Sequence, residues 1–195
     1  MVQKWDNIDY EIILELIRYK IHLRGLSKEI KVPHTTLSRR LSFLRKKLII
    51  DYKSEGKNKV FFLRKNLISQ KAIINAENYK CIKILAKYPT LMPIFQDIIE
   101  KSKCSLIMLF GSYAKEIPKE DSDIDIYIET EDLKIKKNLG LLSDSLSIKI
   151  GKFNADDLLL KEIIKNHVII KGAEEYYETL RHPANRHCLR QKRFS

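Results

Sequence analysis

The most informative part of this chain is Leu106-Ile107-Met108-Leu109-Phe110-Gly111-Ser112-Tyr113-Ala114-Lys115, followed after a short polar segment by Ser122-Asp123-Ile124-Asp125-Ile126-Tyr127-Ile128. Its first five residues form a continuous apolar run, which is typical of a strand covered on both faces. Gly111 favours a tight turn and a close approach of the backbone to a ligand. Ser112 and the N–H groups after it are suitable donors for a phosphate. The sequence therefore predicts a buried strand, a Gly-Ser turn and a second strand.

The second strand carries two carboxylates on one of its faces. Its side chains alternate, with Ile124, Ile126 and Ile128 on one face and Asp123, Asp125 and Tyr127 on the other. At roughly 3.3 Å per residue, the two acids lie about 7 Å apart along the strand. Two like charges on one face are unfavourable unless a cation or a basic partner offsets them, so a pair of solvated acids is the weaker interpretation. Carboxylate oxygens in this arrangement suit a hard divalent cation such as Mg²⁺.

Basic residues are concentrated at the two ends of the chain. The 195 residues have a net charge of +12, with 37 Lys and Arg against 25 Asp and Glu. Residues 1–80 hold 18 basic against 8 acidic residues, residues 81–180 hold 14 against 17, and residues 181–195 hold 5 against none. This distribution predicts two modules with different partners, of which the N-terminal one binds a polyanion.

Cysteine content and hydropathy favour a cytoplasmic protein. The three cysteines are odd in number and far apart, which fits neither a disulfide framework nor a zinc site. No run approaches the roughly 20 apolar residues of a membrane span. Polar residues near the N-terminus, among them Asp6 and Asp9, interrupt the apolar segment that a signal peptide needs. We therefore expect no membrane partner.

The first part of the chain has a helical pattern. Apolar spacing predicts a helix over residues 9–20, with Asn7 or Asp9 as its cap. We expect residues 24–26 to break this pattern and a short helix to follow over residues 28–31.

A third helix and a hairpin come next. Pro33 lies in the first turn of that helix, where proline is tolerated. The buried stripe of the helix is expected to be Leu37, Leu41, Leu44 and Leu48. Two β-prone segments, 48–52 and 60–63, are joined by a basic turn over residues 54–59.

Helix, short helix, polar-faced helix and basic hairpin, in this order and with these lengths, resemble a winged helix-turn-helix domain over residues 9–63. The resemblance implies that the third helix enters the major groove of double-stranded DNA and that the hairpin touches the phosphate backbone. Thr35, Ser38, Arg39 and Ser42 would face base edges, and Lys53, Lys57 and Lys59 would lie near phosphates. Two other interpretations stay open: the charges solvate an exposed helix, or the domain serves dimerisation or protein contact.

A connecting helix is expected over residues 65–89, because Pro89 stops the helical pattern. It carries an apolar stripe with steps of three and four, made of Ile68, Ala72, Ala76, Tyr79, Ile82 and Ala86. Such a stripe fits either a core face or the seam of a homodimer that reads two DNA half-sites.

The central stretch resembles the nucleotidyltransferases of the DNA polymerase beta-like superfamily, in particular the minimal nucleotidyltransferases of prokaryotes. Gly111-Ser112, ten intervening residues and Asp123-Ile124-Asp125 match the signature of that superfamily, and the match is close from about Lys103 to Ile128. The resemblance implies a small mixed sheet backed by helices over residues 90–180. The expected fold class is therefore α+β, with a winged helix-turn-helix over residues 1–64 followed by a small mixed-sheet nucleotidyltransferase domain.

The resemblance also implies roles for individual residues. Gly111 and Ser112 would contact the β- and γ-phosphates of a nucleoside triphosphate, and Lys115 would neutralise phosphate charge. Asp123 and Asp125 would ligate the Mg²⁺ that assists in-line attack at the α-phosphorus, with pyrophosphate leaving. A nucleoside monophosphate, expected to be AMP, would pass to a hydroxyl. Some relatives are antitoxins that modify a tyrosine of a partner toxin, and others modify small molecules, so a protein acceptor is one of the expected partners.

One departure from the superfamily lies on the next expected strand, residues 146–150. Active relatives usually carry a third acid on a later strand, and in many of them it helps to activate the attacking hydroxyl. The polar face of this strand offers Ser147 and Lys149, with Asp144 just before it. Lys149, if it points into the site, would bind phosphate or replace part of the metal's charge. The alternative function is therefore a transcriptional regulator whose nucleotidyltransferase domain only binds nucleotide or is inactive.

The remaining segments carry fewer candidate residues. Helices are expected over residues 132–142, 158–165 and 174–180, and a short strand over residues 167–170. Residues 181–195 form a basic tail without acids, which fits a phosphate-contacting arm or a solvated terminus.

Overall fold

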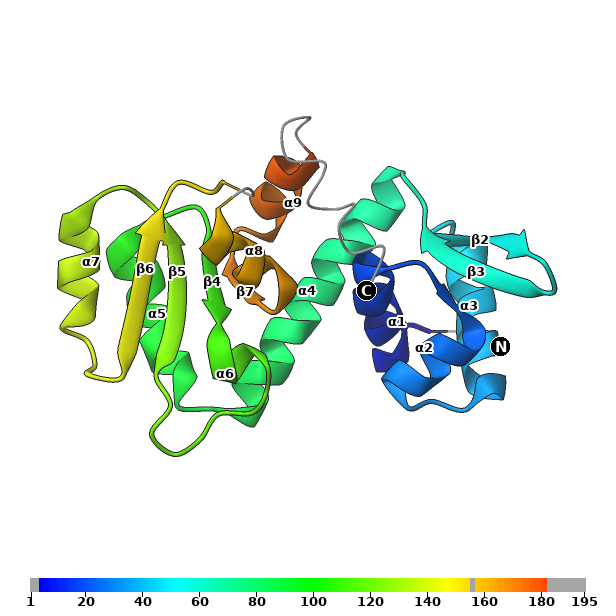
Figure 1. Ribbon diagram of the computed structural model, residues 1–195, viewed down its shortest axis with the longest axis horizontal. Helices are drawn as coiled ribbons and strands as arrows, with labels where there is room; N and C mark the ends of the chain where they lie inside the picture. Colours follow the sequence, from blue (N-terminus) through cyan, green and yellow to red (C-terminus); the bar gives the residue numbers. More distant parts are fainter. Residues whose placement is uncertain (1–3, 155–156, 182–195) are drawn as a thin grey trace. The chain divides into compact units, whose positions relative to one another are not determined.

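The computed structural model describes residues 4–154 and 157–181, which form two compact units (Figure 1). Within those residues, one unit comprises positions 4–76 and the other positions 77–181. The boundary lies inside helix α4 (Leu67–Lys87), the helix expected to connect the modules. Apart from its first residue, the expected basic tail lies outside the described residues.

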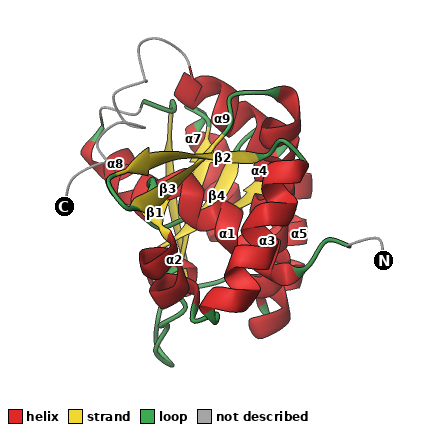
Figure 2. Ribbon diagram, turned by 90° about the vertical axis from the view of Figure 1, so that its right-hand side faces the viewer, coloured by secondary structure: helices red, strands yellow, loops and turns green. Residues whose placement is uncertain are grey.

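The N-terminal unit contains three complete helices, the first part of α4 and a small antiparallel sheet (Figure 2). Its elements are α1 (Asn7–Arg18), β1 (Ile21–His22), α2 (Leu23–Ile30), α3 (His34–Lys46), β2 (Ile50–Glu55) and β3 (Asn58–Leu63). The strands lie in the order β1-β3-β2, and the β2–β3 hairpin is in register from Ile50 opposite Leu63 to Glu55 opposite Asn58. The expected order of helices and hairpin is therefore present, with β1 as an additional strand.

The boundaries of the first two helices differ from those expected. Asp6, rather than Asn7 or Asp9, caps α1: its carboxylate accepts from the N–H of Ile8, and the Asp9 side chain accepts from the N–H of Asp6. Helix α2 begins at Leu23 and runs through Gly25, where a break was expected. A Cβ at Gly25 would lie 2.9 Å from Cγ1 of Ile21, so this glycine permits close packing of β1 and does not form a turn.

The end of the third helix and the hairpin turn also differ from the expected bounds. Leu37, Leu41 and Leu44 are buried as expected, but Leu48 lies beyond the end of α3 with a φ of 60° and is 47% exposed. The expected six-residue basic turn is wrong, because both strands extend through it and leave a tight turn at Gly56, where φ is 60°. Positive φ is readily adopted by glycine.

A buried ion pair joins α1 to α3. The guanidinium of Arg40 donates from Nε to Oδ1 of Asp9 at 2.7 Å and from Nη2 to Oδ2 of the same carboxylate, and it also donates to the carbonyl of Lys4. Asp9 is fully buried and Arg40 is 5% exposed. The hydrogen bond to Asp9 raises the pKa of Arg40 above its ordinary value. Arg40 is therefore a structural residue and does not belong to the exposed basic face of α3.

Helix α4 does not bury the single stripe that its sequence suggests. Ala72 and Ala76 are buried as expected, whereas Ile68 and Ile82 are 51% and 65% exposed. Ile84, outside the expected stripe, is buried in the core of the C-terminal unit. The buried side of the helix thus changes along its length, and the change accompanies the boundary between the units.

The C-terminal unit is built on a four-stranded mixed sheet, as expected. Its elements are α5 (Leu91–Ser102), β4 (Ile107–Phe110), α6 (Gly111–Ala114), β5 (Ile124–Glu129), α7 (Leu133–Gly140), β6 (Leu146–Gly151), α8 (Leu158–Lys165), β7 (Val168–Lys171) and α9 (Ala173–Arg181). The strand order is β6-β5-β4-β7, with β5 and β6 parallel and the other pairs antiparallel. Helix α5 lies behind the sheet in Figure 1, and α7 lies beside β6.

The core of this unit follows the alternation read from the sequence. Ile124, Ile126 and Ile128 of β5 are buried in one cluster with Phe95 and Ile98 of α5. All four residues from Leu106 to Leu109 are fully buried, as expected for a strand covered on both faces. None of the helices formed by residues 4–154 and 157–181 is long and apolar enough to cross a bilayer.

Candidate active site

The two halves of the sequence signature meet at the ends of β4 and β5. Phe110, the last residue of β4, pairs with Asp125 of β5, so the turn that begins at Gly111 lies directly against the Asp125 side chain. A Cβ at Gly111 would overlap Oδ2 of Asp125 and lie 2.9 Å from its Cγ. Gly111 also has a φ of 69°, which side chains other than glycine rarely adopt. Glycine is therefore required here both by backbone conformation and by the space that Asp125 occupies.

Asp123 precedes β5 and is exposed, whereas Asp125 lies on the strand and is half-buried. The neighbouring chain holds this end of β5 in place, because the N–H of Ile124 donates to the carbonyl of Ser145 at 2.8 Å. Ser122 accepts from the N–H of Lys119 and so orders the loop before the strand. The structure thus brings both acids to the end of the sheet where β4 ends and the Gly-Ser turn begins.

The turn itself is a four-residue helix, α6, that starts at Gly111 (Figure 1). The N–H groups of a first helical turn have no intrahelical partner, and they point outward at the N-terminal end of the helix. Ser112 lies in this turn and is half-buried. Lys115 follows α6 as its C-cap and is exposed. The hydrogen bond from Lys165 lowers the pKa of Glu162 on α8, and the charge of Lys115 adds to this lowering.

The strand on the other side of β5 contributes no carboxylate beside Asp125. In the parallel pairing of β5 with β6, Ser147 is the partner of Asp125 and Lys149 is the partner of Tyr127. Residues paired across two strands point to the same face of the sheet. Lys149 therefore lies two residues farther along β6 from the Gly-Ser turn than Ser147. Lys149 is exposed, and Asp144 is also exposed in the turn before β6. Within the described residues, β6 therefore places a hydroxyl and not a carboxylate beside Asp125.

Tyr127 lies on the same face as Asp125 and is 2% exposed. Its hydroxyl donates to the carbonyl of Gly151 at 2.8 Å. Burial, together with the charges of Glu129 and Asp157, raises the pKa of the Tyr127 phenol. This phenol therefore keeps its proton and serves as a fixed donor that joins β5 to the end of β6.

The loop between the two halves of the signature is anchored at Glu116. This residue has a φ of 61°, and its carboxylate lies 2.9 Å from Nζ of Lys87 and 3.8 Å from Nζ of Lys83 on α4. The hydrogen bond from Lys87 and the charges of nearby lysines lower the pKa of Glu116. No local sequence pattern indicates this anchor, because its partners lie about 30 residues earlier in the chain.

The residues at the site suit a Mg²⁺ whose other ligands are phosphate oxygens of the substrate and water. Magnesium is commonly held by one or two carboxylates, with substrate phosphates and water as the other ligands. Asp123 and Asp125 supply two carboxylates near the first turn of α6, where N–H groups have no intrahelical partner. Among the described residues, no three His, Cys, Asp or Glu side chains gather into a metal-ligand cluster.

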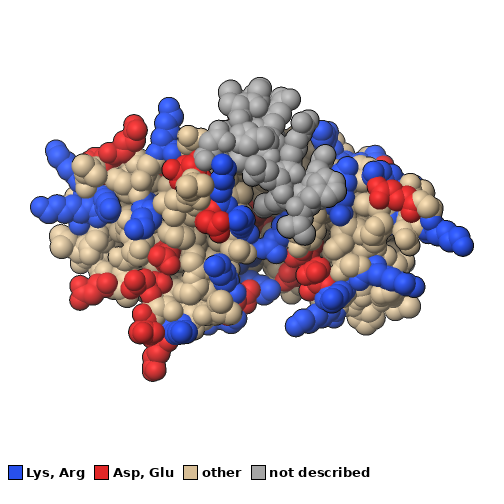
Figure 3. All heavy atoms as spheres, viewed as in Figure 1, with Lys and Arg blue, Asp and Glu red and all other residues tan. Residues whose placement is uncertain are grey.

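The candidate DNA-contacting residues are all exposed on the N-terminal unit. Thr35, Ser38, Arg39 and Ser42 lie on α3, while Lys53 lies on β2, Lys57 in the hairpin turn and Lys59 on β3. Two of the lysines have partners: Lys53 lies 2.5 Å from Glu55, and Lys59 lies over the ring of Tyr52. In Figure 3, Lys and Arg side chains project from this unit, which is at the right of the view.

Comparison with known proteins identifies the same region of the chain. Residues 94–176 match the family model described as polymerase beta nucleotidyltransferase. Three proteins of Methanocaldococcus jannaschii that carry the name of protein adenylyltransferases are similar to part of this chain. MJ1217 is 42% identical over 80 residues, which are 39% of this chain and 76% of the relative. MJ0128 is 45% identical with the same coverage, and MJ0126 is 38% identical over 84 residues, or 41% and 80%. No solved structure gives a significant match.

Proposed function

Because this chain belongs to the polymerase beta nucleotidyltransferase family, we propose that it transfers AMP from Mg²⁺-bound ATP to a hydroxyl of an acceptor protein. The observation that carries this proposal is the close approach of the Asp125 side chain to Gly111, which brings one of the two acids against the Gly-Ser turn. The preference for AMP and for a protein acceptor is supported by the names of the relatives.

The site residues divide into two groups with complementary charge. Asp123 and Asp125 are the metal ligands, because they are the carboxylates at the sheet edge where the turn begins. Gly111, Ser112 and the N–H groups of α6 contact the β- and γ-phosphates, since first-turn N–H groups favour anions. Lys115, exposed at the end of α6, adds a positive charge beside the phosphates.

The reaction is a displacement at the α-phosphorus of the nucleotide. The oxygen of the acceptor hydroxyl bonds to the α-phosphorus, the bond to the bridging oxygen of the β-phosphate breaks, and pyrophosphate leaves. A Mg²⁺ held by Asp123 and Asp125 would withdraw charge from the phosphates and orient them. Ser147 occupies the position beside Asp125 where a carboxylate could have acted as base. The acceptor proton therefore passes to one of the two acids or to water.

Transfer is tested with ATP labelled at the α-phosphate, Mg²⁺ and a mixture of proteins as acceptors. Label should appear in protein with the wild-type chain and fall to background with Asp123→Asn plus Asp125→Asn. The matched control is Glu120→Gln plus Asp121→Asn, which removes the same charge from exposed positions of the preceding loop. Equal labelling by the wild type and the Asp123/Asp125 variant would contradict the proposal, as would equal loss in the control.

A second function is favoured by the N-terminal unit, namely binding of double-stranded DNA. The order α1, α2, α3 and hairpin fits a winged helix-turn-helix, and the exposed polar residues lie on α3 and on the hairpin, as that domain requires. The excess of basic over acidic residues in positions 1–80 supports a polyanionic partner. A homodimer bound to two half-sites remains compatible with this proposal.

Salt dependence is the most direct test of DNA binding. Affinity for duplex DNA should fall steeply with salt, because bound lysines and arginines release counterions. Arg39→Ala should weaken binding and relax sequence preference, whereas Lys57→Ala should weaken binding to all sequences alike. Lys134→Ala, an exposed lysine of α7 in the other unit, is the control. Affinity that does not change with salt would contradict this function. So would a Lys134→Ala variant that weakens binding as much as Arg39→Ala or Lys57→Ala.

A further inference from the structure

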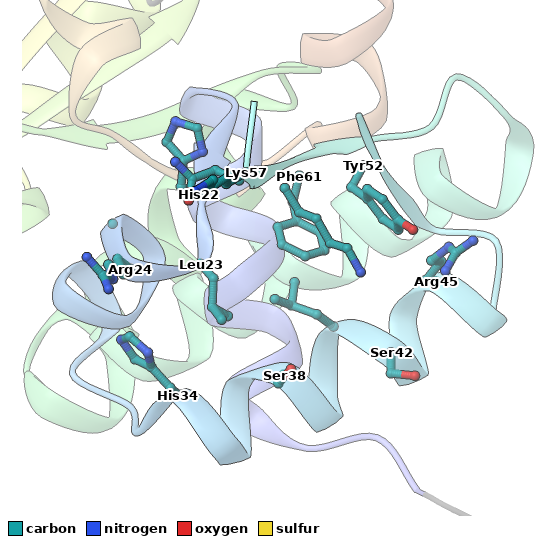
Figure 4. Close-up of a pocket in the computed structure, with 14 residues that line it drawn as sticks. His22, Leu23, Arg24, His34, Ser38, Ser42, Arg45, Tyr52, Lys57 and Phe61 are labelled. Carbon is teal, nitrogen blue, oxygen red and sulfur yellow. The ribbon is translucent and has the colours of Figure 1, made fainter. Parts of the chain in front are cut away.

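A pocket of ≈ 720 Å³ lies in the N-terminal unit between α3, the start of α2 and the β2–β3 hairpin (Figure 4). Its lining residues fall between positions 22 and 61, so it is complete within one unit. Pockets of roughly 300–1,000 Å³ commonly hold small organic ligands. The proposed transfer reaction does not use this pocket, because Gly111, Asp123 and Asp125 belong to the other unit.

The pocket combines an apolar floor with a cationic rim. Leu41 and Phe61 are 2% and 8% exposed and form part of its lining, and the Phe61 ring points toward its centre in Figure 4. Four permanently charged side chains also line it: Arg24, Arg45, Lys57 and Lys59. None of the 14 described residues that line it is acidic. An occupant with an apolar part and several negative charges would be complementary to both regions.

The ring of Tyr52 holds two of these cations at one end of the pocket. The guanidinium carbon of Arg45 lies 4.8 Å from the ring centroid, and Nζ of Lys59 lies 4.5 Å from it. Asp51 restrains Arg45 further, at 3.6 Å from its Nε. The two cations come from α3 and β3 and are positioned before any ligand arrives. Such preorganisation lowers the entropy cost of binding an anion.

We propose that this pocket binds a free organic phosphate of nucleotide size, with its phosphates on Arg45 and Lys59 and its apolar part against Leu41 and Phe61. Four cations without a lining carboxylate favour a ligand with several negative charges over a simple carboxylate. A DNA duplex is a less complete occupant. Its phosphates lie on the outside of a stiff helix, so they reach the rim and leave the apolar floor uncovered.

This ligand would compete with DNA, a consequence that rests on the second proposed function. Ser38, Ser42, Lys57 and Lys59 line the pocket and also belong to the candidate DNA-contacting residues. A side chain engaged by a bound phosphate is no longer available to a DNA phosphate. The N-terminal unit would therefore release DNA when the small ligand is abundant, and the size of the effect follows from the difference in affinity of the ligand for the free and DNA-bound forms.

The test is calorimetric titration of ATP, AMP and inorganic pyrophosphate into the full chain. A background of Asp123→Asn plus Asp125→Asn, with a chelator present, removes metal-dependent binding at the transfer site. ATP and AMP should bind in this background. Arg45→Ala plus Lys59→Ala should weaken their binding by about tenfold or more, because hydrogen bonds to charged groups are lost. Pyrophosphate should bind more weakly than ATP, since it lacks the apolar part.

Two further variants distinguish specific binding in the pocket from nonspecific electrostatic attraction. Lys28→Ala plus Lys46→Ala removes the same charge from exposed positions of α2 and α3 that do not line the pocket, and it should leave ATP affinity unchanged. Ser42→Phe fills the pocket from an exposed position without changing charge, and it should abolish binding. The proposal is overturned if neither ATP nor AMP binds in the background, if both charge-removing pairs weaken binding equally, or if Ser42→Phe has no effect. Each result is independent of whether the wild type transfers AMP in the presence of Mg²⁺.

Discussion

Gly111 is the residue on which the geometry of the proposed site depends most directly. Gly111→Ala would force Asp125 to move, because a Cβ and Oδ2 of Asp125 cannot occupy the same space. A displacement of about 1 Å in a catalytic group can cost on the order of 100-fold in rate. We expect AMP transfer by Gly111→Ala to fall by about that factor or more. The loss is measured with labelled ATP at saturating Mg²⁺.

The hairpin glycine provides the control for this substitution. Gly56 has a φ of 60°, close to the 69° of Gly111, but a Cβ there has no neighbour within 4 Å. Gly56→Ala therefore carries a similar conformational cost without the collision, and it should lower the melting temperature while leaving transfer intact. If both variants lose transfer to the same extent, backbone strain and not the position of Asp125 explains the effect.

At the level of elements, the Asp9–Arg40 pair joins α1 to α3 inside the N-terminal unit. Arg40→Met leaves the Asp9 carboxylate buried without its partner, and breaking a buried pair in this way typically costs about 3–5 kcal/mol. Asp9→Asn combined with Arg40→Met removes both charges and should recover a large part of this loss. Urea unfolding of the two variants measures the difference in the free energy of unfolding. A double variant no more stable than Arg40→Met would show that shape, and not charge, determines the cost.

The Glu116 anchor makes a pH-dependent contribution to the C-terminal unit. Its pKa is lowered from the ordinary value of 4.5, chiefly by the hydrogen bond from Lys87. A carboxylate with a lowered folded-state pKa stabilises the fold fully above its unfolded-state pKa and loses this contribution as the pH falls through the folded-state value. The stability difference between wild type and Glu116→Gln should thus be constant above pH 4.5 and shrink below it. Denaturant titrations at several pH values provide the measurement, and a difference that grows toward acid pH would contradict this assignment.

Sequence patterns predicted those elements whose signals are local. The strand before Gly111, the isoleucine face of β5 and the helix that starts after Asp157 all depend on neighbouring residues, and all three are present. The expected break at Gly25 is wrong, because the role of Gly25 depends on Ile21 of β1, and that contact exists only in the folded chain. As a core face, the expected stripe of α4 is only partly buried, because periodicity assumes one packing partner along a helix, whereas α4 runs from one unit into the other. Its alternative role as a homodimer seam stays a prediction.

At the scale of the whole molecule, the basic excess and the two candidate site acids lie in different units. The basic excess lies in positions 1–80, and the two site acids lie in the unit that starts at position 77. No residue proposed for DNA contact belongs to the same unit as Asp123 or Asp125. The sequence alone revealed this division through its charge distribution, but it could not show the pocket of the N-terminal unit, because that pocket depends on how α3 and the hairpin fold together.

This division predicts that the two proposed activities can be lost separately. Asp123→Asn plus Asp125→Asn should abolish AMP transfer and leave the affinity for duplex DNA unchanged, because α3 and the hairpin are unaltered. Arg39→Ala should weaken DNA binding and leave transfer at the wild-type rate, since it is an exposed residue of the other unit. Both variants are assayed for label transfer and for salt-dependent DNA binding in the same buffer. A variant that loses both activities while keeping its melting temperature would mean that the units communicate, and separate domains would then be the wrong description of how this chain works.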